Sequence, residues 1–115
     1  MPSNFFPNIG YVNYGRDFNY FQKITVTWTT FGGNSVDGYQ PDAIITFPTQ
    51  GILLLNEDTA SVIQVSYNGL TVHDQLDPTL PSKGVAYDNR VVSTIWLKLV
   101  SGASAVVSIR AWGTR

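Results

Sequence analysis

The sequence has no cysteine, a single histidine and few charged residues. The absence of cysteine excludes a disulfide framework and every metal site built on thiolates. Charged residues make up 13% of the chain, compared with roughly 25% in typical soluble domains. Lys and Arg total 7 against 8 Asp and Glu, so the net charge is -1. Without a basic excess, binding to nucleic acid phosphates has little electrostatic support, and we predict no nucleic-acid partner.

Long hydrophobic runs are missing as well. No window approaches 18 uninterrupted apolar residues, so we predict no membrane span. The first residues, MPSNFFPNIGYVNYGRDF, lack a basic stretch followed by an apolar one, which is unlike a signal peptide. We therefore expect folding in the cytoplasm of the producing cell. The 115 residues, 43% hydrophobic and 13% aromatic, suffice for one domain with a core.

Residues 1–21 form a segment of their own, rich in aromatic residues, Asn, Gly and Pro, and without a clean period of 2 or 3.6. We predict an ordered N-terminal arm over 1–21, followed by a β domain over 22–115. The arm either covers the core of its own domain or docks on a neighbouring subunit, where aromatic side chains are favoured anchors. Its expected interface residues are Phe5, Phe6, Tyr11 and Tyr14.

Short alternating or apolar runs predict strands over residues 22–30, 43–47, 52–55, 62–67, 70–73 and 85–87. Ile24, Val26 and Trp28 should share the inward face of the first strand. The run 52–55 is apolar throughout and should be covered on both faces. Asn68-Gly69 predicts a two-residue type I′ turn that sets Val65 opposite Val72.

Residues 94–113 predict a hairpin with a three-residue loop and a left-handed residue at or beside Gly102. One face of this hairpin is an ordinary core row, and the other mixes apolar and basic side chains, including Trp96, Arg110 and Trp112. Because such a face is too apolar for water and too charged for a core, we expect these three residues to be covered by protein. The connection 74–84 should cross between sheets. About eight short strands without a helical segment predict an all-β fold, a single antiparallel β-sandwich with jelly-roll or Greek-key topology.

No constellation of residues predicts catalysis. His73 has no second histidine to share a metal and should be solvated or hydrogen-bonded across strands on a polar face. The carboxylates fall in or beside predicted turns, where Asp caps its own backbone. They are Asp37, Asp42, Glu57, Asp58, Asp74, Asp77 and Asp88. We therefore predict no enzyme, cofactor or metal site. A carbohydrate- or receptor-binding module is the alternative, with Tyr39, Tyr87, Trp96 and Trp112 as candidate sugar-stacking rings.

The stretch 62–113 resembles a group of small β proteins of tailed bacteriophage virions. The resemblance lies in the Tyr67-Asn68-Gly69 turn with His73-Asp74 nearby, the turn 87–90 (YDNR), Ile95-Trp96, Ser101-Gly102 and Ala111-Trp112. It implies a capsid decoration protein of the virion that binds the major capsid protein, or else a tail, neck or head-fibre component. It also implies a homo-oligomer, and we expect a trimer because decoration proteins often occupy symmetry axes.

Overall fold

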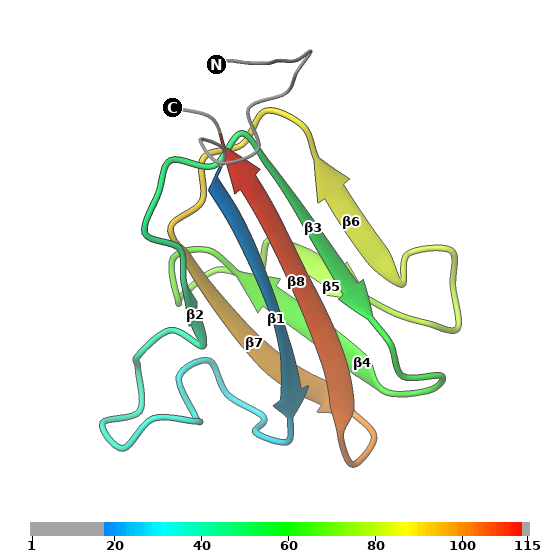
Figure 1. Ribbon diagram of the computed structural model, residues 1–115. Coiled ribbons are helices and arrows are strands. Elements are labelled where there is room, and N and C mark those ends of the chain that lie inside the picture. The colour runs from blue at the N-terminus through cyan, green and yellow to red at the C-terminus, as the bar shows by residue number, and fades with distance from the viewer. Residues whose placement is uncertain (1–17, 114–115) are drawn as a thin grey trace, which may run out of the picture.

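The computed structural model describes residues 18–113 and contains eight strands and no helix in that range (Figure 1). The strands are β1 (Phe18–Val26), β2 (Ala43–Ile44), β3 (Gly51–Asn56), β4 (Val62–Ser66), β5 (Asp74–Leu76), β6 (Gly84–Tyr87), β7 (Thr94–Ser101) and β8 (Ala105–Gly113). They form two antiparallel four-stranded sheets, ordered β1-β8-β3-β6 and β2-β7-β4-β5. The predicted all-β sandwich is confirmed. No helix in this part of the chain is long and apolar enough to cross a membrane.

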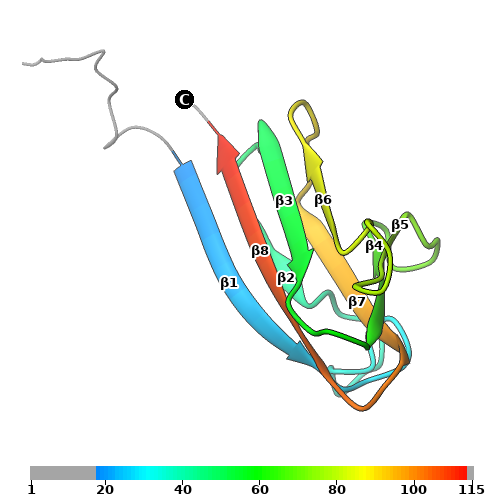
Figure 2. The same cartoon turned by 90° about the vertical axis from the view of Figure 1, so that its right-hand side faces the viewer.

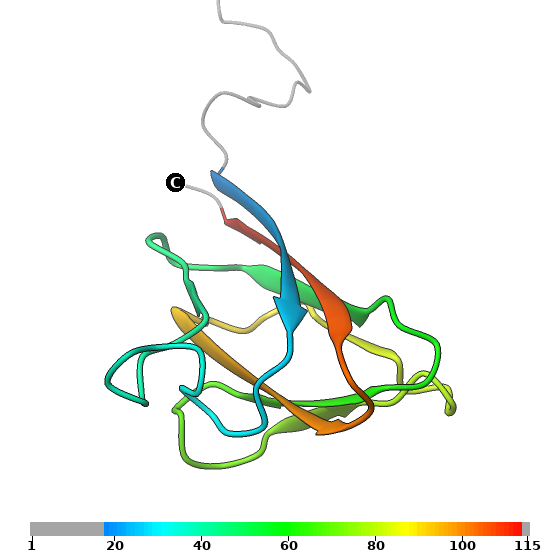
Figure 3. The ribbon, with the colours of Figure 1, turned by 90° about the horizontal axis from the view of Figure 1, so that it is seen from below.

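The strand order is that of a jelly roll. The strand pairs β1–β8, β2–β7, β3–β6 and β4–β5 join the first half of the chain to the second half in reverse order. The chain therefore behaves as one long two-stranded ribbon that is rolled up so that its pairs alternate between two sheets. Figures 2 and 3 show these sheets as two facing layers. Of the two predicted topologies, the structure has the jelly roll.

The core lies between the sheets and is made by alternate residues of the long strands. The completely buried aliphatic side chains are Val26, Ile52, Leu54, Ile63, Val65, Leu76, Ile95, Leu97, Val107 and Ile109. Ile24 and Trp28 pack against this cluster, so the predicted inward face of the first strand is confirmed. That strand begins at Phe18, four residues earlier than expected, and takes in the last residues of the predicted arm. Phe5, Phe6, Tyr11 and Tyr14 lie outside the described residues.

The predicted hairpin over 94–113 is wrong. β7 pairs with β4 and β2, whereas β8 pairs with β1 and β3, so the two strands lie in opposite sheets. Leu97 lies opposite Val65, and Ile109 lies opposite Leu54. The core row was predicted correctly because alternation identifies which side chains point inward, not which strand lies alongside. Gly102, at φ +92°, does adopt the predicted left-handed conformation in the connecting loop.

The predicted two-residue turn at Asn68-Gly69 is also wrong. Val65 lies opposite Asp74 rather than Val72, which lengthens the loop between β4 and β5. Side chains explain the difference, because the Asn68 Oδ1 accepts hydrogen bonds from the backbone N–H groups of Leu70 (2.8 Å) and Thr71 (2.9 Å). Such side-chain bonds compete with the strand ladder for the same donors. The predicted connection 74–84 is shorter than expected, because its first residues form β5, and the crossing to the other sheet occupies residues 77–83 before β6.

Candidate interaction surfaces

The outer face of the sheet β1-β8-β3-β6 carries more apolar surface than solvent contact favours. The strand pairing aligns Phe21, Arg110 and Leu53 in one row across the sheet, because directly opposite residues share a face. We call this surface the outer β8 face. Its large side chains are Phe21, Leu53, Leu55, Val106, Arg110 and Trp112. Leu53 and Leu55 are half-buried, so the outer side of β3 is less covered than the sequence predicted.

Two aromatic side chains stand out on the outer β8 face. Phe21 is 53% exposed and Trp112 is 37% exposed. The Arg110 guanidinium lies over the Phe21 ring, 4.3 Å from its centroid, in cation–π geometry. Trp112 lies flat on Gly51, where an added Cβ would be 2.2 Å from the indole Cζ2. Because residue 51 has no side chain, the Trp112 indole can pack directly on the backbone of β3, and the opposite face of the ring remains exposed.

Trp96 does not belong to this surface. It projects from the outer face of β7, in the opposite sheet, so the single mixed face predicted for residues 94–113 is in fact divided between two sheets. Its indole Nε1 donates a hydrogen bond to the Tyr39 carbonyl oxygen (3.0 Å), and its ring packs against Gly69. Trp96 is thus covered, in part, by loops of its own chain. Whether another molecule covers Arg110 and Trp112 stays a prediction.

A polar cluster closes the gap between β5, at the edge of one sheet, and β6, at the edge of the other. The Asp74 carboxylate accepts hydrogen bonds from two tyrosine hydroxyls, Tyr67 to Oδ2 at 2.8 Å and Tyr87 to Oδ1 at 2.6 Å. The Arg90 guanidinium lies over the Tyr87 ring, 3.8 Å from its centroid. We call these four residues the tyrosine clamp, since Asp74 belongs to one sheet and Tyr87 to the other.

Burial and the nearby Asp74 charge both raise the pKa of Tyr67 far above its usual value. The same two causes, burial first, raise the pKa of Tyr87. Both hydroxyls therefore keep their protons at neutral pH and remain donors to Asp74. Both carboxylate oxygens already accept a hydrogen bond from a tyrosine hydroxyl. The arrangement therefore suits a structural contact that holds the two sheets together rather than a proton-transfer site.

His73, next to the clamp, is exposed, and its Nδ1 accepts a hydrogen bond from the Tyr67 backbone N–H (3.0 Å). This is one of the two states predicted for the only histidine. Asp74 departs from the prediction, because it bridges two strands instead of capping a turn. No sequence pattern predicted that Tyr67, Asp74, Tyr87 and Arg90 would lie together.

Asp42 also departs from the prediction, because its Oδ2 accepts the backbone N–H of Leu97 on β7 (2.7 Å) instead of capping a turn. Two further carboxylates do behave as turn residues. Asp58 accepts backbone hydrogen bonds from Ala60 and Ser61, and Asp77 accepts one from Thr79. The Ser61 N–H, 2.7 Å from Asp58, is the main reason why the pKa of that carboxyl is lowered. Within residues 18–113, no group of three or more His, Cys, Asp or Glu side chains is placed to hold a metal ion.

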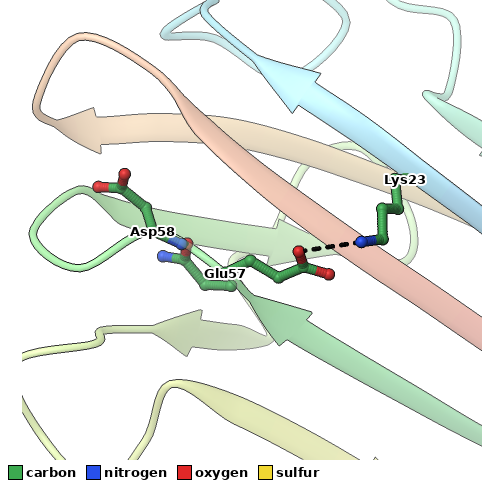
Figure 4. A network of polar contacts seen from close by, with 4 residues as sticks. Lys23, Glu57 and Asp58 are labelled. Atoms are coloured by element: carbon green, nitrogen blue, oxygen red, sulfur yellow. Dashed lines mark hydrogen bonds and ion pairs between the residues drawn. The ribbon is translucent and has the colours of Figure 1, made fainter.

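Glu57 instead forms an ion pair with Lys23, with 3.2 Å between Oε1 and Nζ (Figure 4). The pair crosses the outer side of β8 and joins β1 to the residue that follows β3. Arg110 is the second basic side chain on the outer β8 face, beside Lys23.

The candidate sugar-stacking rings are mostly engaged within the chain. Arg90 covers one side of Tyr87, Gly69 contacts the ring of Trp96, and Gly51 lies beneath Trp112. Tyr39 is 69% exposed, in the loop before β2. A shallow hollow of about 320 Å³ lies elsewhere, and no titratable side chain lines it; its walls are Pro48, Thr49, Gln50, Asn89 and Val91. The rings and the hollow do not combine into one pocket with charged partners.

Residues 18–113 thus form a jelly-roll domain whose outer β8 face combines exposed aromatic and basic side chains. No protein-family model matches the chain, and no curated protein matches it.

Proposed function

We propose that this protein is a non-enzymatic structural component of a bacteriophage virion, and that it decorates the capsid by binding the major capsid protein. The jelly roll supports the proposal only at the level of fold, since viral capsid proteins, lectins and cupins all use it. The observation that carries the proposal is the outer β8 face, where exposed Phe21 and Trp112 accompany Arg110. Aromatic side chains and arginine are the residue types enriched at protein interfaces.

A decoration protein needs a surface that is compatible with water in the free protein but whose burial against the capsid lowers the free energy. The outer β8 face fits this need, because its basic side chains are engaged within the chain while its aromatic rings are partly open. Burial of apolar area contributes about 25 cal/mol per Å², and a central Trp anchor can dominate such an interface. We therefore place the capsid-binding side on the outer β8 face and assign Trp112 and Arg110 to it.

Co-sedimentation with capsids assembled without this protein tests the proposal. We expect the wild-type protein to sediment with capsids, and Trp112→Ser to bind more than about tenfold more weakly, as expected for an anchor worth over 1.4 kcal/mol. Val100→Ser is the matched control, because Val100 is 50% exposed on β7 in the opposite sheet. Circular dichroism checks that both variants remain folded.

Three outcomes would oppose the assignment. Wild-type protein that binds no capsid refutes the decoration role, and binding to isolated tails instead would move the protein to the tail or neck. Equal losses of capsid affinity for Trp112→Ser and Val100→Ser would show that the outer β8 face is not the binding side.

Homo-oligomerisation is also part of the proposal. Light scattering after size-exclusion chromatography measures the number of copies, for which we expected three from the sequence.

A further inference from the structure

The four edge strands of this jelly roll differ greatly in length. The edge strands β2, β5 and β6 have two, three and four residues, whereas β1 has nine. Proteins commonly protect their sheet edges by keeping edge strands short or by placing proline, bulges or charges there. β1 is long and contains neither proline nor glycine. Among residues 18–113, only β8 pairs with it, on one side (Figure 2).

The single charge on β1 is neutralised within its own chain. Lys23 is the only charged residue between Phe18 and Val26, and its ammonium group pairs with Glu57 at 3.2 Å. A lysine on an edge strand usually repels a second strand. Here Glu57 compensates that charge, so the edge offers backbone donors and acceptors without a net charge to repel a copy of itself.

We infer that β1 pairs antiparallel with β1 of a second copy about a two-fold axis, so that two β1-β8-β3-β6 sheets join into one continuous sheet. The inference goes beyond capsid binding and concerns self-association alone. Two-fold interfaces use the same patch on both molecules, which requires a self-complementary strand. β1 meets this requirement in its sequence, and within residues 18–113 no strand pairs with its outer edge.

The residues of β1 favour a particular alignment. With the axis at Gln22, Phe21 lies opposite Lys23 of the second copy, and Tyr20 lies opposite Ile24 of the second copy. The first pair sets a cation against an aromatic ring, and the second sets an aromatic against a β-branched side chain, both favourable across strands. An axis at Lys23 would set lysine against lysine. A shift of the pairing by one residue would turn core side chains outward, so both of these alternatives are disfavoured.

The absence of native cysteine makes this alignment directly measurable. Directly opposite residues of an antiparallel pair have Cα atoms about 4.5–5.5 Å apart, within disulfide range, whereas residues displaced along the strands do not. Under mild oxidation, we expect Gln22→Cys to form a covalent dimer in more than about half of the molecules. Asn19→Cys, Thr25→Cys and the control Val100→Cys, on the opposite sheet, should remain mostly uncrosslinked. Equal crosslinking at Gln22 and Val100 would overturn the inference.

A charge-swap experiment tests the same contact without a covalent bond. Gln22→Glu and Gln22→Lys each place like charges at the axis, so each variant alone should shift toward monomer by light scattering. An equimolar mixture should regain the dimer, because opposite charges then meet. Circular dichroism spectra that match the wild type would show that both variants keep the fold, since loss of the dimer can by itself lower the thermal midpoint.

A wild-type protein that stays monomeric, a trimer without β1 crosslinks, or a mixture that stays monomeric would each refute the β1 pairing. The two-fold contact thus gives a dimer in place of the trimer expected from the sequence. These experiments use no capsid, so a failure of β1 pairing and a failure of capsid binding are observed separately.

Discussion

Removal of the Asp74 carboxylate should open the tyrosine clamp. Asp74 accepts hydroxyl hydrogen bonds from Tyr67 at 2.8 Å and Tyr87 at 2.6 Å, and it lies on the sheet opposite to Tyr87. Hydrogen bonds to a charged group contribute about 1.5–3 kcal/mol when shielded, and less when exposed. Tyr67 is the more buried of the two tyrosines, so its hydroxyl should suffer most from losing its acceptor. We expect Asp74→Ala to lower the free energy of unfolding by roughly 2–4 kcal/mol.

Urea unfolding at pH 7, followed by tryptophan fluorescence, measures this loss. All variants are compared at one protein concentration, because self-association would add to the apparent stability. Asp74→Asn keeps one acceptor oxygen and should lose about half as much. Asp88→Ala, in the exposed turn after β6, is the matched control and should stay within about 0.5 kcal/mol of wild type.

A double-mutant cycle decides whether the loss comes from the hydroxyl contact. Combining Asp74→Ala with Tyr67→Phe should give a coupling energy of about 1 kcal/mol or more, since both changes remove the same bond. Additive losses would mean that Asp74 stabilises the fold in another way. An Asp74→Ala variant as stable as Asp88→Ala would refute the clamp altogether.

Three further outcomes are expected. Gly51→Ala should displace the Trp112 indole, which lies where the new Cβ would be, and lower stability by about 1–3 kcal/mol, with a shifted fluorescence maximum as the local signal. Asn56→Ala should cost about 2–4 kcal/mol by urea unfolding, because this fully buried amide donates hydrogen bonds to two backbone carbonyls, whereas an exposed Thr79→Ala should cost less. Stability should fall as pH rises above about 10: the raised pKa keeps Tyr67 protonated in the folded protein while the unfolded chain loses that proton. Unfolding titrations between pH 8 and 11 should show a shallower fall for Tyr67→Phe, and equal slopes for the two proteins would contradict this assignment.

The inward faces of the strands could be predicted from the sequence, but the partners of those strands could not. Ile95, Leu97 and Leu99 occupy every second position of their strand, as do Val107 and Ile109, and all five are buried. The same alternation is produced by a hairpin and by two strands that face each other across a core. Since the loop at Gly102 can serve either arrangement, only the remaining strands decide which pairing buries more surface.

The tyrosine clamp could not be predicted from local sequence patterns either. Tyr67, Asp74 and Tyr87 are brought together by a crossing between sheets, and their contact depends on the loop after Asn68 being longer than the predicted turn. An Asn-Gly pair favours a tight turn only when its neighbours leave the backbone donors free. Here Ser66 Oγ accepts the Gly69 N–H at 2.9 Å, in addition to the bonds that Asn68 accepts.

The place of β8 between β1 and β3 has a consequence for how the chain folds during synthesis. Phe18 lies opposite Gly113, so the β1–β8 pairing joins the first and the last of the described residues. Such distant pairings carry a large loop-closure cost and form slowly. β1 leaves the ribosome first, yet the strand that separates it from β3 arrives last. Until β8 has emerged, no other strand of residues 18–113 can pair with β1 in the nascent chain, and in this interval a chaperone or a second nascent chain on the same messenger RNA has the best access to it.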